Sequence, residues 1–116
     1  MNVINYTIRE YSGVKIMDLA GSLNSNTVGG FQKAVKVIAD KESLILNLSN
    51  VEMITTSGLN VLIDLSYFAK QNGERIVIMW PSEELIKMVD SVDVYSSLIF
   101  ADSPEEGITK IKHFVQ

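Results

Sequence analysis

The segment VEMITTSGLN, residues 51–60, joins an apolar strand pattern to the most hydrophobic helical pattern of the sequence. The strand pattern is LILNL at residues 44–48, and the helical pattern runs from Leu59 to Ala69. Three consecutive hydroxyl residues end at Gly58, where a strand-to-helix connection turns. The free N–H groups and the dipole of a helix N-terminus favour negative charge. We therefore hypothesise that Ser57 is a switch, which binds one partner when unmodified and loses it when phosphorylated.

A structural role for the same serine is the alternative. Ser57 could cap a helix that begins at Gly58, which is a common task for serine. A phosphate on Ser57 would add about −1.5 to −2 charges and three acceptor oxygens. The helix end would tolerate that charge, whereas an apolar or acidic partner surface would repel it. The residues alone leave both roles open.

The chain before this segment predicts a hairpin and a helix. Residues 3–11 and 14–20 have strand patterns on either side of a Ser12-Gly13 turn signal, which favours an antiparallel pair. Apolar residues then recur at helical spacing over residues 28–38. We expect Asn24 or Ser25 to cap this helix. The glycines at positions 29 and 30 predict a late or frayed start.

The chain after the segment continues the alternation of strands and helices. Residues 43–48 predict a buried strand, residues 75–80 a fourth strand, and residues 96–100 a short fifth strand. Short helical patterns follow Ser82 and Ser103, each of which is a suitable cap. This order predicts one α/β domain over residues 1–116, with a mixed, mostly parallel sheet of about five strands, about four helices and an N-terminal antiparallel hairpin.

The helical pattern that follows Gly58 is apolar over more than half of its circumference. Such a helix is either deeply buried or presents part of its apolar surface to another molecule. Both interpretations remain open.

Composition and charge narrow the possible functions. The chain is 47% hydrophobic and 21% charged, with a net charge of −4, which argues against non-specific binding to nucleic acid. It has no cysteine, which suits the cytoplasm. The N-terminal residues lack a signal-peptide pattern, and no apolar run approaches the length of a membrane span. We expect a cytoplasmic protein without a membrane partner.

The sequence offers little catalytic chemistry. Its single histidine, His113, lies off the apolar stripe of the last helical pattern, and we interpret it as a surface residue. The residues around Ser57 lack the first glycine of a nucleophile elbow, and no phosphate-binding loop or metal-ligand spacing occurs. We expect a protein that is not an enzyme and has no catalytic residues, metal or cofactor.

Four motifs in order resemble the STAS domain of the anti-sigma-factor antagonist family. AGSLNSNT at residues 20–27 resembles the family's Gly-x-Leu-Asp-x-x-Thr segment, and LNLSNV at 46–51 resembles its Leu-Asp-Leu-Ser-x-Val strand. ITTSGL at 54–59 resembles its Met-Asp-Ser-Ser-Gly-Leu motif. The stretch from Val89 through Phe100 and Asp102 resembles the segment before the last helix. The likeness covers nearly the whole chain.

The resemblance implies transcription regulation by partner switching. Members of the family bind an anti-sigma factor, which is a serine kinase, when they are unphosphorylated. The kinase phosphorylates the serine before the motif's glycine, which is Ser57 here, and a phosphatase reverses the reaction. Asn24, Asn47 and Thr55 stand where the family usually has aspartate. The changes at positions 24 and 55 alter the charge beside the switch serine.

The resulting predictions name a set of residues and two further alternatives. Ser57 is the expected phosphoacceptor and Thr56 the alternative one, and the expected partner-binding residues are Asn24, Thr55, Thr56, Ser57, Gly58 and Asn60. Gly58 would allow a partner's close approach, and the exposed side of the following helix would contact that partner. We expect a monomer or weak dimer. The alternatives are an unphosphorylated STAS scaffold subunit of a larger assembly and a small-ligand-binding STAS module.

Overall fold

A computed structural model describes residues 3–92 and 98–115. The elements in chain order are β1 (Ile4–Tyr11), β2 (Val14–Leu23), α1 (Val28–Ala39), β3 (Leu44–Ile54), α2 (Thr56–Gln71), β4 (Ile76–Met79), α3 (Glu83–Val92), β5 (Ile99–Ala101) and α4 (Pro104–Val115). The single α/β domain with an initial hairpin is therefore as predicted.

The five strands form one sheet in the order β1-β2-β3-β4-β5. The β1–β2 pair is antiparallel and the other three pairs are parallel. The hairpin turn has two residues, Ser12 with φ 50° and Gly13 with φ 83°. Positive φ at both positions is the type I′ geometry, whose twist matches that of the strands it joins.

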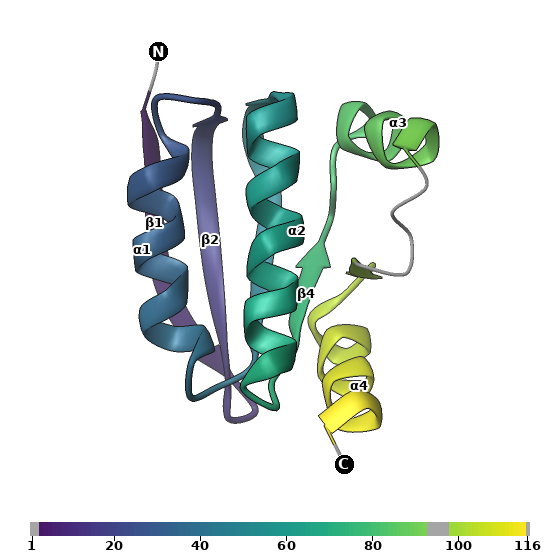
Figure 1. Ribbon diagram of the computed structural model, residues 1–116. Coiled ribbons are helices and arrows are strands. Elements are labelled where there is room, and N and C mark those ends of the chain that lie inside the picture. The colour runs from purple at the N-terminus through teal and green to yellow at the C-terminus, as the bar shows by residue number, and fades with distance from the viewer. Residues whose placement is uncertain (1–2, 93–97, 116) are drawn as a thin grey trace.

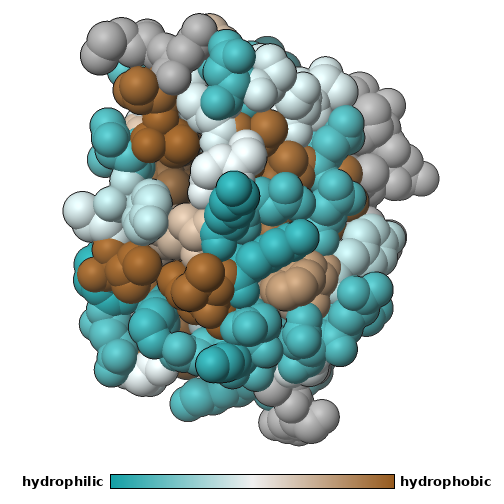
Figure 2. All heavy atoms as spheres, turned by 60° about the vertical axis from the view of Figure 1, so that its left-hand side comes forward, coloured by the Kyte–Doolittle hydropathy of each residue, from teal (hydrophilic) through white to brown (hydrophobic). Residues whose placement is uncertain are grey.

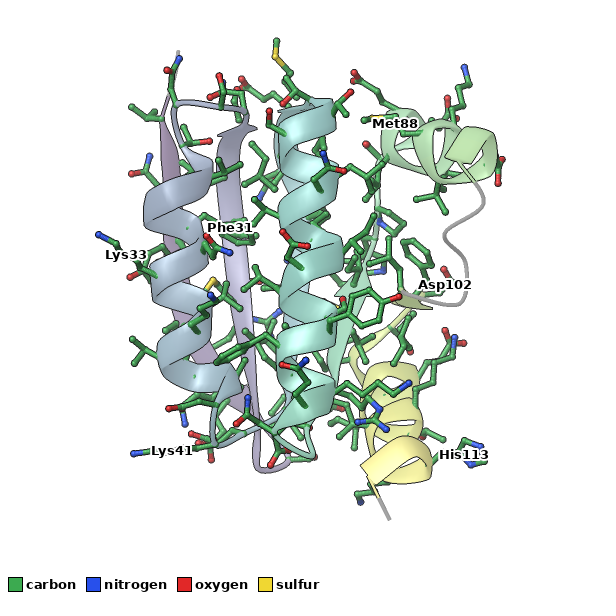
Figure 3. The ribbon with its side chains drawn as sticks, viewed as in Figure 1. Phe31, Lys33, Lys41, Met88, Asp102 and His113 are labelled. Atoms are coloured by element: carbon green, nitrogen blue, oxygen red, sulfur yellow. The ribbon has the colours of Figure 1, made fainter. Side chains whose placement is uncertain are left out.

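Helices cover the sheet on both faces. Leu19 and Leu46 of the sheet pack with α1, α2 and α3 in one apolar cluster, whereas Ile16 and Ile45 pack with α4 in another. Because parallel strands are joined by right-handed crossovers in one direction along the sheet, their three helices share a face. Figure 1 shows α1 and α2 side by side across that face, and Figure 3 shows Phe31 pointing inward from α1 while Lys33 and Lys41 point away.

The predictions about the start of α1 are wrong. The helix begins at Val28 despite the two glycines, and the N-cap is Thr27, whose side chain makes no capping hydrogen bond. The backbone oxygen of Asn24 accepts from the N–H groups of Thr27 and Val28, both at 3.0 Å. These bonds, together with the buried Phe31, stabilise the first turn without help from side-chain capping.

The strand bounds differ from the predicted ones. β3 extends to Ile54 because it continues to pair with β2 through two register shifts. β4 ends at Met79 rather than Trp80, which has φ 55° and is followed by Pro81. β5 covers Ile99–Ala101, and residues 96 and 97 lie outside the described residues. The start of α4 is as predicted, because the Ser103 hydroxyl accepts from the N–H of Glu106 at 3.1 Å.

Candidate functional site

The connection between β3 and α2 is fixed by Thr55. Its backbone N–H donates to the Leu23 carbonyl at 2.9 Å, which ties the end of β3 to the end of β2. Thr55 is the N-cap, and its hydroxyl oxygen accepts from the N–H of Gly58 at 3.4 Å. The interpretation of Ser57 as the cap of a helix that begins at Gly58 is therefore wrong.

Ser57 is the second residue of α2 and is partly exposed. Thr56 before it and Asn60 after it are exposed. The backbone N–H groups of Thr56 and Ser57 precede the first intrahelical hydrogen bond, so they remain available to an anion. No acidic residue occupies the first turn. A negative group on Ser57 would therefore meet the positive end of the helix without a competing carboxylate on that turn.

Helical spacing places Ser57 on the side of α2 that faces α1. Ser57, Val61 and Phe68 fall on one stripe at intervals of four and seven residues. Phe68 marks the direction of this stripe, because the Lys36 ammonium of α1 lies 5.1 Å from the centre of its ring. Leu23 at the end of β2 pairs with Ile54 at the end of β3. The helices that follow these two strands therefore begin at the same end of the sheet.

The loop between β2 and α1 lies at the same end of the sheet, and hydrogen bonds of the buried Asn24 hold its conformation. Asn24 is only 8% exposed. Its Oδ1 accepts from the N–H of Asn26 at 2.9 Å, and its own N–H donates to the Thr27 hydroxyl at 3.0 Å. The exposed side chains of this loop are Ser25 and Asn26. The predicted partner-binding set contains neither of these two residues, because only burial distinguishes them from Asn24.

Gly58 is buried, and the close approach it allows is internal. A Cβ at this position would lie 2.8 Å from the Leu23 carbonyl oxygen and 3.0 Å from the Leu23 Cβ. The glycine thus lets the first turn of α2 pack against the end of β2. All six predicted partner-binding residues lie near the ends of β2 and β3. Thr56 and Asn60 are exposed, Thr55 and Ser57 are partly exposed, and Asn24 and Gly58 are buried.

Burial accounts for most of the apolar surface of α2. Leu59, Leu62, Leu65 and Ala69 are buried, and the exposed strip consists of Thr56, Asn60, Asp64, Tyr67, Lys70 and Gln71. Between them lie the partly buried Val61, Ile63 and Phe68. A protein that approaches this helix beside Ser57 would meet a mainly polar surface. Figure 3 shows that Met88 of α3 lies toward the opposite flank of α2.

Asn47 lies on the other face of the sheet. It is two residues after Ile45, which packs with α4, so both side chains point to that face. Its amide donates to Asp18 at 2.7 Å and its oxygen accepts from the Ser49 N–H at 3.0 Å. Arg9 binds the same carboxylate at 2.6 Å, and this hydrogen bond holds the pKa of Asp18 below its usual value. Of the three positions where the family has aspartate, only 24 and 55 lie near Ser57.

Among residues 3–92 and 98–115, no group of three or more histidine, aspartate or glutamate side chains is arranged to hold a metal ion. Within the same ranges no helix is long and apolar enough to cross a membrane. His113 is exposed near the end of α4 (Figure 3), at the opposite end of the fold from Ser57.

The protein is a small α/β domain with a mixed sheet. A serine in the first turn of its second helix lies beside the loop that joins β2 to α1. The STAS domain model matches residues 5–107, and the chain belongs to the STAS domain family. No match was found among curated protein sequences.

Several solved structures share the fold. TM1081 of Thermotoga maritima has a TM-score of 0.80 and 19% identity, with 92% of this chain and 94% of that chain covered. The anti-sigma factor antagonist SpoIIAA of Bacillus, solved in its phosphorylated form, has a TM-score of 0.67 and 14% identity, with 92% and 99% covered. The murine anion transporter Slc26a9 has a TM-score of 0.68 and 19% identity, with 90% of this chain but only 18% of that chain covered.

Proposed function

We propose that the chain is a cytoplasmic anti-sigma-factor antagonist that acts by partner switching. In its unphosphorylated form it binds an anti-sigma factor with serine kinase activity, and phosphorylation of Ser57 releases it. A phosphatase restores the binding form. The observation that carries this proposal is the position of Ser57, which is partly exposed in the first turn of α2 and is not used as the cap.

Two further observations support phosphorylation at this position. The cap is supplied by Thr55, so a modified Ser57 would leave the connection between β3 and α2 intact. A phosphate at the second helical residue is favoured by the free N–H groups and the dipole of α2. Among the structural relatives, SpoIIAA has been solved in unphosphorylated and phosphorylated forms.

Charge supports the loss of binding on phosphorylation. The reachable surface of α2 beside Ser57 consists mainly of uncharged polar groups, and a phosphate adds about −1.5 to −2 charges there. Binding to a partner surface that is complementary to the neutral serine then requires the phosphate to lose its hydration. This desolvation makes the binding free energy less favourable. Every 1.4 kcal/mol of lost binding free energy is about a tenfold loss of affinity, so one modification suffices to separate the complex without unfolding either protein.

Intact-protein mass spectrometry tests the modification directly. The chain is incubated with ATP and its cognate anti-sigma factor kinase, and the modified residue is located by peptide mapping. We expect one added phosphate on Ser57, lost in Ser57→Ala and retained in Thr56→Ala, which is the matched control one residue away. Transfer to Thr56 instead would move the switch, and no transfer at all would favour an unphosphorylated scaffold role.

A further inference from the structure

The eight-residue strand β1 lies at the side of the sheet, and within residues 3–92 and 98–115 no strand pairs with its outer edge. β1 is the first strand in the sheet order and pairs only with β2. Its middle carries two large apolar side chains that remain well exposed, Tyr6 at 46% and Ile8 at 45%. Figure 2, which brings the α1 and β1 side forward, shows apolar groups set among polar ones there, and α1 on that side carries Val37, which is 76% exposed. A long strand edge with apolar side chains favours pairing with another strand.

The hairpin geometry determines which backbone groups this edge offers. Tyr11 and Val14 flank the two-residue type I′ turn and therefore form a hydrogen-bonded pair. Hydrogen-bonded and non-hydrogen-bonded pairs alternate along an antiparallel ladder. The odd-numbered residues of β1 thus direct their N–H and C=O groups to β2. The even-numbered residues Ile4, Tyr6, Ile8 and Glu10 direct theirs outward.

We propose that this edge pairs with the β1 edge of a second copy of the chain, antiparallel about a two-fold axis at Thr7. In this register Tyr6 of each copy lies opposite Ile8 of the other, and Ile4 opposite Glu10, each as a hydrogen-bonded pair. Thr7 lies opposite Thr7. The two five-stranded sheets become one continuous sheet, and the outward N–H and C=O groups of both strands are satisfied.

The axis at Thr7 is the register that places both exposed apolar residues of one β1, Tyr6 and Ile8, opposite those of the other. An axis at Arg9 places two guanidinium groups opposite each other, and an axis at Ile8 leaves the exposed Tyr6 of each copy without an apolar residue opposite it. With the axis at Thr7, no two like charges are opposite, and Arg9 faces Asn5. The Arg9 Nε also lies 2.6 Å from the Asp18 Oδ2 of the same chain. The guanidinium group therefore points toward β2 rather than toward the free edge of β1.

The dimer is independent of the proposed function of Ser57. Ser57 lies where the strands β2 and β3 end, whereas the dimer uses the lateral edge of the sheet at β1. Either proposal can therefore fail without the other.

A cysteine at the two-fold axis tests the register, since the chain has no cysteine of its own. Opposite residues of a non-hydrogen-bonded pair have Cα atoms about 4.5 Å apart, which lies within the range of about 4.4–6.8 Å for disulfides. Thr7→Cys should therefore form a covalent dimer under mild oxidation. Asn5→Cys is the matched control on the same face of β1, because its Cα would lie about 14 Å from its counterpart, at about 3.4 Å for each of four residues along the strand.

Sedimentation velocity over a range of concentrations tests the association without cross-linking. The unmodified chain should show a monomer–dimer equilibrium, and Ile8→Lys should raise the dimer dissociation constant about tenfold or more because two cross-strand apolar pairs are lost. Ile86→Lys, at an exposed apolar position of α3, should leave it unchanged. A monomer at all concentrations, equal cross-linking of Thr7→Cys and Asn5→Cys, or equal effects of the two lysine variants would overturn the proposal. Circular dichroism confirms that each variant is folded.

Discussion

At the scale of single residues, three neighbouring positions in the first turn of α2 have separate tasks. Thr55 caps the helix, Ser57 is presented to the surface, and Gly58 packs inward against Leu23. The sequence predicts that a hydroxyl caps this helix but not which one, because Thr55, Thr56 and Ser57 are all chemically suitable. The choice follows from the hydrogen bond between the Thr55 N–H and Leu23 of β2, which is a tertiary contact.

The assignment of the cap predicts unequal effects for two adjacent threonines. Thr55→Ala removes the oxygen that accepts from the Gly58 N–H, and we expect a loss of about 0.5–2 kcal/mol in the free energy of unfolding. Thr56→Ala, at an exposed position, should change it by less than about 0.5 kcal/mol. Urea denaturation measures both. A larger loss for Thr56 than for Thr55 would mean that the helix is capped differently.

Two glycines at helix starts should respond to alanine in opposite directions. Gly58→Ala places a Cβ 2.8 Å from the Leu23 carbonyl oxygen, and we expect it to destabilise the fold by about 1–3 kcal/mol. Gly29→Ala meets no atom within 4 Å, so the better helix propensity of alanine should stabilise by up to about 1 kcal/mol. Thermal and chemical denaturation of the two variants give the comparison. Stabilisation by Gly58→Ala would show that α2 does not pack closely on β2.

At the scale of elements, contacts between elements determine those helix and strand ends that the local sequence patterns do not predict. The hairpin, the buried strands and the start of α4 are predictable because turn residues, apolar runs and a serine–proline cap are local signals. The extension of β3 to Ile54 is not, since residues 49–53 are exposed at all positions but Val51. That segment is a strand because β2 runs beside it. The early start of α1 likewise depends on the Asn24 carbonyl and buried Phe31 rather than on helix propensity.

The contact between β1 and β2 predicts a pH dependence of stability. The Arg9 guanidinium lowers the pKa of Asp18 from its usual value of 3.8. A carboxylate with a lowered pKa in the folded state adds stability above its unfolded pKa, and this contribution is lost as the pH falls through the folded value. We expect the free energy of unfolding to decrease below about pH 4.

The variant Asp18→Asn isolates this contribution. It should lower the free energy of unfolding at pH 7 and reduce the decline on acidification. Asp64→Asn, on the exposed strip of α2, should change the free energy of unfolding at pH 7 by less than about 0.5 kcal/mol. Denaturation at a series of pH values measures both slopes. An unchanged acid slope in Asp18→Asn would show that the Arg9 contact has no effect on stability.

At the scale of the whole molecule, the order of strands places the candidate site at one edge. Because β2 and β3 are parallel neighbours, the loop that follows β2 and the helix that follows β3 meet where both strands end. The predicted partner-binding residues come together there, namely Asn24, Thr55, Thr56, Ser57, Gly58 and Asn60. The sequence predicts this grouping through the fold class. It does not predict which members are exposed, since Asn24 and Gly58 are used in internal packing. Nor does it predict that Asn47 lies on the other face.

The most direct measurement is the affinity of the cognate anti-sigma factor for the unmodified chain and for the chain phosphorylated on Ser57, compared by isothermal titration calorimetry. We predict a loss of affinity of about tenfold or more on phosphorylation, equivalent to about 1.4 kcal/mol, with an unchanged circular dichroism spectrum. Equal affinity for the two forms, or a phosphorylated chain that is no longer folded, would contradict the account.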